Sequence, residues 1–240
     1  TFAGMTKKEK IKSFAPNAPG ASANNIFGLP FTIEESEIVI IPLPWEVTVS
    51  YKAGTAHAPK AIFDASFQVD LFDPYVKDAW KIGLTMEEIS TEWEKKNNSL
   101  RRKAVTYLKL LEKGEDCFGN SMMKKIREEI DSNALGLKTW LKKKSLDYLD
   151  KNKLVVALGG DHSTPLGLME ALSEKFNCFR ILHIDAHFDM RNAYEGFEFS
   201  HASIMFNALK IPQVKKLVSV GIRDYCEEEM KVISVQKNRT

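Results

Sequence analysis

Apolar residues along the chain follow two patterns, one typical of strands and one typical of helices. The apolar run within residues 37–41 predicts a strand that is covered on both faces. Residues 154–158 predict a second buried strand, and residues 179–184 and 217–220 predict two further strands. Between about 85 and 150, apolar residues instead recur at helical spacing among many charged side chains, which favours surface helices with a solvated face.

Proline and glycine positions divide the chain between these elements. Residues 1–36 are predicted to be irregular, because prolines and glycines interrupt any long periodicity. Helices are predicted near 59–63, after Thr164 and near 202–209. Strand–helix–strand units joined in this way imply parallel strands with right-handed crossovers. We therefore predict a three-layer α/β/α fold with a central, mostly parallel sheet and a charged helical insertion near 85–150.

Composition narrows the class of protein. The chain has 240 residues, of which 44% are hydrophobic and 28% charged, as in ordinary globular proteins and unlike disordered chains. Its 34 Lys and Arg against 32 Asp and Glu give a net charge of +2, too small to drive nucleic-acid binding. The 3 cysteines include no Cys-x-x-Cys pair, so neither a disulfide framework nor a zinc finger is expected. No apolar run approaches the roughly 18 residues of a membrane span, so we expect a soluble, cytoplasmic protein without a membrane partner.

Ionisable side chains follow two of the predicted strands where each strand ends. His162 lies in a Gly-Gly-Asp-His-Ser sequence after the strand at 154–158, and Asp185, His187 and Asp189 alternate after the next strand. The carboxyl ends of parallel strands meet at one edge of a sheet, where binding sites gather. Burying such a trio unpaired would cost several kcal/mol. We therefore interpret these residues as metal ligands, and the absence of thiolates favours Mn²⁺ or a similar ion over structural zinc.

The spacing of the trio limits how it can bind. Residues two apart in a straight strand lie roughly 6.6 Å apart, so one ion can collect all three only if the chain curls, unless two ions share them. Asp161 is expected to cap a turn or support a ligand rather than bind metal itself. His183 lies deeper in its strand, points with Asp185 and is expected to pack. His57 is expected to be structural.

The Gly-Gly-Asp-His-Ser sequence that contains His162 and the sequence from Asp185 to Asp189 resemble signature sequences of the ureohydrolases. This family comprises the arginases, the agmatinases and their relatives. Residues 54–62 and 219–223 are similar to two further family segments, and the resemblance covers residues 37–80 and 153–229. The agmatinase branch is the most similar, because Arg191 and Ala202 stand where arginases usually have Asn and Gly. Agmatine lacks the α-carboxylate that arginases recognise.

The resemblance implies metal-dependent hydrolysis of a small guanidino substrate, above all agmatine to putrescine and urea, by a hydroxide bound to two Mn²⁺ ions. It implies His162, Asp185, His187 and Asp189 as metal ligands and His201 as a catalytic residue that transfers a proton near the substrate. Arginine, guanidinobutyrate and formimidoylglutamate are alternative substrates. The family also implies a homo-oligomer.

One family feature is missing. The family completes its two-metal site with aspartates from a later Ser-x-Asp-x-Asp-x-x-Asp-Pro segment, and residues 1–240 contain no such segment. We therefore expect a single ureohydrolase-like domain over residues 1–240 that lacks its C-terminal portion. A chain that truly ended at Thr240 would instead favour a non-catalytic metal-binding or scaffolding role.

Overall fold

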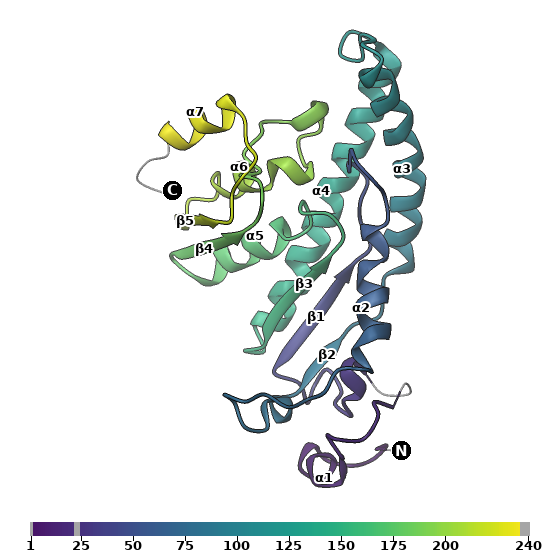
Figure 1. The fold of residues 1–240 in the computed structure, drawn as a ribbon, viewed down its shortest axis with the longest axis vertical. Helices are drawn as coiled ribbons and strands as arrows, with labels where there is room; N and C mark the ends of the chain where they lie inside the picture. Colours follow the sequence, from purple (N-terminus) through teal and green to yellow (C-terminus); the bar gives the residue numbers. More distant parts are fainter. Residues whose placement is uncertain (1, 22–24, 236–240) are drawn as a thin grey trace.

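The computed structural model of the protein describes residues 2–21 and 25–235 (Figure 1). Its strands are β1 (Ile38–Leu43), β2 (Leu84–Met86), β3 (Leu154–Gly159), β4 (Phe179–Ile184) and β5 (Val214–Val220). Its α-helices are α1 (Lys7–Ser13), α2 (Ala58–Ser66), α3 (Thr91–Glu112), α4 (Ser121–Leu149), α5 (Leu166–Lys175), α6 (Ile204–Ala208) and α7 (Glu227–Val235). Short 3-10 turns are η1 (Ile26–Gly28), η2 (Thr55–His57), η3 (Ala79–Ile82), η4 (Tyr194–Gly196) and η5 (His201–Ser203).

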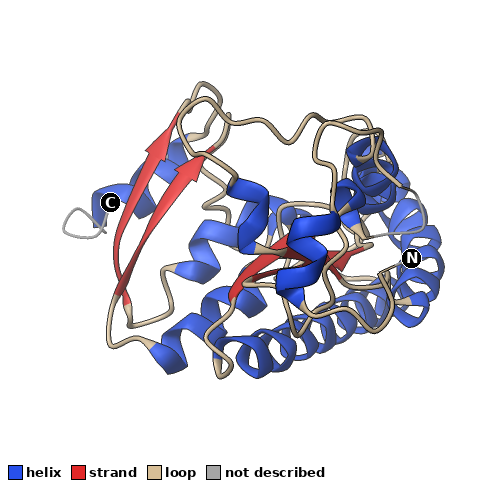
Figure 2. Cartoon of the chain, turned by 90° about the horizontal axis from the view of Figure 1, so that it is seen from below, coloured by secondary structure: helices blue, strands red, loops and turns tan. Residues whose placement is uncertain are grey.

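The strands pair in parallel, which confirms the predicted α/β class. In the described part of the chain they form two sheets, one with the order β2-β1-β3 and one that pairs β4 with β5 (Figure 2). β1 and β3 pair along their whole length, from Ile38 opposite Leu154 to Leu43 opposite Gly159. The predicted single central sheet is therefore present as two parallel parts, and side chains at the strand ends join them.

The core lies around β1, as its apolar run predicts. Val39, Ile41 and Leu43 are completely buried. Trp45 continues this core beyond the strand and meets Trp93 of α3 edge to face, with the ring centroids 6.0 Å apart. The covered faces of β1 therefore fix the position of the loop that follows it.

The prediction that residues 154–158 form a fully buried strand is wrong. Leu154 of β3 is 62% exposed, and Leu182 and Ile184 of β4 are 66% and 74% exposed. The described residues cover only one face of these strands. An apolar run predicts a strand from local sequence, but burial depends on what packs against it from elsewhere.

Two long helices account for the charged region. α3 and α4 lie side by side (Figure 1), and the Lys103 ammonium is 2.5 Å from the Glu129 carboxylate between them. One side of the pair is solvated, as predicted, while the other buries aromatic and aliphatic residues against the core. α1 lies in the segment that was expected to be irregular. Its Thr6 and Glu9 form a capping box, a signal that the sequence does carry. No helix within the described ranges has the length and apolar character needed to cross a bilayer.

Candidate metal centre

His162 connects the ends of the two sheets. Its Nδ1 lies 2.6 Å from Oδ2 of Asp189 and 3.1 Å from Oδ2 of Asp185. His162 follows β3, whereas Asp185 follows β4 directly. Asp189 has a φ of 52°, so the chain curls there instead of continuing as a strand. This curl is the condition under which both carboxylates can face one site.

His183 completes the group, although it was expected only to pack. Its ring is 5.4 Å from that of His162, and its Nε2 is 3.7 Å from Oδ2 of Asp185. The side chain is almost fully buried, and Nε2 has no hydrogen-bond partner among residues 2–21 and 25–235. Ligand atoms of His162, His183, Asp185 and Asp189 all lie within 4.8 Å of one another. The strand alternation that pairs His183 with Asp185 was the available signal, and it indicated the correct side of the strand.

His187 lies at the margin of this four-residue cluster. Its side chain is 57% exposed, with Nδ1 3.5 Å from Oδ1 of Asp185 and Nε2 3.7 Å from Oδ2 of Asp224. The His187 backbone N–H donates to the same Asp185 oxygen at 2.9 Å. The structure therefore brings three of the four predicted ligands together and leaves the ring of His187 beside them. Its role as a ligand stays a prediction.

Electrostatics in the cluster favour a positive charge between the carboxylates. Burial disfavours protonation of His162, but the hydrogen bond to Asp189 and the charges of Asp189 and Asp185 outweigh burial and raise its pKa. Burial together with the nearby His162 lowers the pKa of His183. For Asp185, the His187 N–H and both imidazoles outweigh burial and lower its pKa.

These residues fit a divalent cation. The buried Nε2 of His183 is free to bind, and the carboxylate and imidazole donors suit Mn²⁺ or a similar ion. Ligand binding requires neutral imidazoles, so a bound cation would take the place of the proton on His162.

Asp161 and His201 lie outside the cluster. Oδ1 of Asp161 accepts hydrogen bonds from the backbone N–H and the hydroxyl of Ser163, which agrees with the expected capping role. His201 begins η5 and meets Tyr194 edge to face, with ring centroids 5.9 Å apart. Burial raises the pKa of Asp161, and the hydrogen bonds from Ser163 oppose that effect more strongly than the smaller electrostatic effects of His201 and His162 do. His201 therefore lies within electrostatic reach of the loop that carries His162, while its proton-transfer role stays a prediction.

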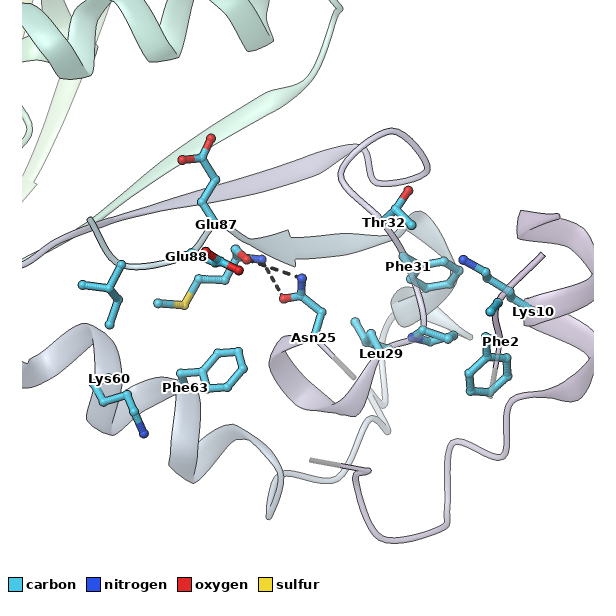
Figure 3. A pocket seen from close by; sticks show the side chains of 14 residues that line it. Phe2, Lys10, Asn25, Leu29, Phe31, Thr32, Lys60, Phe63, Glu87 and Glu88 are labelled. Carbon is cyan, nitrogen blue, oxygen red and sulfur yellow. Dashed lines mark hydrogen bonds between the residues drawn. The ribbon is translucent and has the colours of Figure 1, made fainter. Parts of the chain in front are cut away.

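A cavity of about 830 Å³ lies elsewhere in the molecule (Figure 3). It lies between the N-terminal segment, α2 and β2, and Phe31, Phe63 and Met86 contribute to its apolar lining. Asn25 hydrogen-bonds the backbone of Met86 at its edge. The lining includes none of the predicted site residues, so the candidate chemistry is located by the ionisable cluster rather than by cavity size.

The fold and the cluster define an α/β protein with a carboxylate–imidazole metal site at its strand ends. A sequence model of the arginase family matches residues 36–239, and the chain belongs to that family. This match includes the cluster and both long helices.

Curated relatives carry ureohydrolase names. An N(1)-aminopropylagmatine ureohydrolase from Synechocystis is 26% identical over 200 residues, covering 83% of this chain and 55% of that protein. One from Thermus thermophilus is 30% identical over 190 residues, covering 79% and 52%. An agmatinase from Bacillus anthracis is 26% identical over 200 residues, covering 82% and 56%. The chain thus spans about half the length of the curated relatives it matches.

Solved structures share the fold. The agmatine ureohydrolase of Thermoplasma volcanium aligns with a TM-score of 0.58 at 21% identity, covering 93% of this chain and 60% of that one. Arginase from Medicago truncatula aligns with a TM-score of 0.60 at 21% identity, covering 84% and 54%. These structures confirm the arginase-like fold class that the signature sequences implied.

Proposed function

We propose that residues 1–240 form a ureohydrolase-type domain whose metal cluster serves the hydrolysis of a guanidino compound to urea. The observation that carries this proposal is the convergence of His162 and Asp189, from two different strand ends, at 2.6 Å. The buried, unbonded Nε2 of His183 beside them supports a site made for a cation. The ureohydrolase names of the relatives supply the reaction class.

The chain's residues have distinct tasks in this reaction. A bound divalent metal supplies hydroxide near neutral pH, because it lowers the pKa of its water. Asp185 and Asp189 provide the negative charge that holds cations at the strand ends. His201 gives a proton to the leaving amine, a step that the hydrolysis of any guanidino group requires. Its Nδ1 is buried and makes no hydrogen bond with the described residues, so this atom is not committed to a structural contact.

An amine substrate such as agmatine or N(1)-aminopropylagmatine is favoured over arginine. The Arg191 Nε lies 3.5 Å from Oε2 of the buried Glu229, and its guanidinium stacks 5.4 Å from the ring of Tyr194. Glu229 therefore already balances the charge of Arg191, which makes Arg191 a weaker partner for a substrate carboxylate. Agmatine and its aminopropyl derivative have no carboxylate, and the names of the relatives include both substrates.

A site for two metals needs more acidic ligands than this cluster provides. The family segment Ser-x-Asp-x-Asp-x-x-Asp-Pro does not occur in residues 1–240. We propose that these 240 residues bind one divalent ion through the described cluster, and that full activity requires the missing aspartates. A homo-oligomer, as the family resemblance implies, is part of the same proposal.

Urea release in saturating Mn²⁺ tests the function. Urea release from agmatine, N(1)-aminopropylagmatine and arginine is measured for the 240-residue chain and for a longer protein that carries the aspartate segment. We expect the amines to exceed arginine as substrates, and His57→Ala to match the unchanged protein in each case. Greater activity on arginine would contradict the substrate assignment. Mn²⁺ binding without urea from either protein would favour the non-catalytic alternative.

A further inference from the structure

The loop that leads to His201 has a backbone conformation that needs external support. Ala193 and Glu195 both have a φ of 54°, in the left-handed region that side chains disfavour, and Gly196 has a φ of 86°. Such residues persist only where surrounding structure holds them. The loop of residues 193–199 lies between the strand ends and the α3–α4 pair (Figure 1).

α3 holds this loop through Tyr107. The Tyr107 hydroxyl donates a hydrogen bond to the Glu195 carbonyl at 2.9 Å, and its ring meets Phe197 with centroids 5.1 Å apart. Tyr107 and Phe197 are both completely buried. A Cβ on Gly196 would lie 2.9 Å from the Cδ of Arg127 and 3.0 Å from the Tyr107 hydroxyl. The loop backbone therefore packs directly against the helices.

α4 holds the next residues through Asp131. Its Oδ1 accepts a hydrogen bond from the Glu198 backbone N–H at 2.9 Å, and the Phe199 N–H also stabilises the carboxylate. The Lys138 ammonium lies 5.4 Å from the ring of Phe199. Two helices from the middle of the chain thus contact five consecutive residues of the loop, 195–199.

The loop passes this constraint to His201. The Tyr194 backbone N–H donates to the Ser203 hydroxyl at 3.3 Å, which joins the start of the loop to η5. Tyr194 in turn meets His201 edge to face. The ring of His201 is therefore packed against a residue whose backbone position depends on the helices.

We propose that Tyr107 and Asp131 are positioning residues, which act through the backbone of residues 193–199 to fix the position of His201. The catalytic part of this proposal rests on the proposed hydrolysis, whereas the structural part does not. It gives the α3–α4 pair a role in the site, although neither helix supplies a metal ligand to it.

The electrostatics of Asp131 make this contact sensitive to pH. Burial raises the pKa of Asp131 to about 6, and the charge of Glu198 adds to that effect, while the two backbone N–H groups and Arg127 oppose it. Tyr107 of α3 lies close enough for the charge of Asp131 to raise its pKa slightly, after the larger effect of burial. The folded state therefore binds this proton more tightly than a solvated carboxyl would, so protonation below about pH 6 favours the closed loop. Above it, the buried carboxylate is ionised at a free-energy cost, and the loop is held less firmly.

Two conservative variants test the contacts separately. Asp131→Asn keeps the side-chain shape but removes the charge, and Tyr107→Phe removes only the hydroxyl. Glu129→Gln on the solvated side of α4 and Tyr148→Phe, whose hydroxyl contacts Glu87, are the matched controls. Each variant is examined in the 240-residue chain with Mn²⁺ present.

Amide hydrogen exchange of residues 195–199 gives a result that does not depend on catalysis. We expect exchange to rise by about tenfold in Asp131→Asn and Tyr107→Phe, the effect of one lost hydrogen bond, and to stay unchanged in the controls. After correction for intrinsic exchange rates, the unchanged protein should gain protection below about pH 6, and Asp131→Asn should not. Equal exchange in variants and controls would overturn the proposal.

Steady-state kinetics separate positioning from general destabilisation. In a protein that releases urea, we expect kcat to fall by about tenfold with KM and Mn²⁺ affinity unchanged, because a displaced proton donor slows only the chemical step. A purely structural role predicts an unchanged kcat for the folded fraction, and that result would also overturn the proposal. If neither the 240-residue chain nor the longer protein with the aspartate segment releases urea, the proposed function fails, while the exchange data still decide whether the helices hold the loop.

Discussion

Asp131→Asn should stabilise the folded protein more at neutral pH than in mild acid. The pKa of Asp131 is about 6 in the folded state against 3.8 in its ordinary range, so the folded state binds this proton more tightly. The contribution of Asp131 to stability is therefore full below the unfolded pKa and is lost as pH rises through about 4 to 6. A difference of about 2 pKa units corresponds to about 3 kcal/mol as an upper bound. Solvent screening of this partly exposed carboxylate reduces the expected change to about 1 to 2 kcal/mol.

The measured quantity is the difference in unfolding free energy between Asp131→Asn and the unchanged protein. Urea denaturation followed by tryptophan fluorescence is repeated from about pH 4 to pH 8. Hydrogen bonds that Asn fails to make shift this difference by a constant, so only its slope with pH reports the Asp131 titration. As pH rises to about 6.5, the unfolding free energy of Asp131→Asn should increase relative to that of the unchanged protein. Above that pH the difference should stay constant. A difference that does not change with pH, or one that favours Asp as pH rises, would refute the burial argument. Glu129→Gln should show no such slope.

Two further predictions concern the loop and the proton donor. Gly196→Ala should lower the free energy of unfolding by about 1 to 3 kcal/mol, because its φ is 86° and its Cβ would crowd α3 and α4. In contrast, Gly4 has a φ of 77°, but a Cβ added there would have nothing within 4 Å. Gly4→Ala should therefore lower the free energy of unfolding by only about 1 kcal/mol. Thermal unfolding of both variants measures this difference. His201→Ala should lower urea release while Mn²⁺ stoichiometry by elemental analysis stays unchanged. Loss of the metal instead would mean that His201 holds the site together.

The features of this structure that depend on neighbouring residues could be predicted from the sequence, whereas contacts between distant residues could not. The strand at 37–41, the helices between 85 and 150 and the ionisable sequences after two strands all depend on neighbouring residues, and each was predictable. The exposure of Leu182 depends on what covers β4, which no local pattern encodes. The hydrogen bond that the Glu198 N–H donates to Asp131 joins residues 67 positions apart. A charged residue on an amphipathic helix is usually solvated, so nothing in its spacing distinguished Asp131 from its neighbours.

The candidate site shows the same division. Alternation along the strand after residue 179 placed His183 and Asp185 on one side, yet burial made packing the expected role for His183. The left-handed turn at Asp189 brings its carboxylate to His162, and a φ of 52° at a non-glycine residue has no clear sequence signal. His187 was therefore predicted from its place in a signature sequence, whereas His183 was found only from geometry.

The central claim is that His162, Asp185, Asp189 and His183 form one cation site, and Mn²⁺ titration of single variants tests it most directly. Isothermal titration calorimetry of the 240-residue chain should show one site. His162→Ala, Asp185→Ala and His183→Ala should each weaken it by at least about 100-fold, beyond the range of supporting residues, and His57→Ala should leave it unchanged. His187→Ala reports separately on the predicted fourth ligand. Binding that survives unchanged in both His162→Ala and His183→Ala would contradict the account.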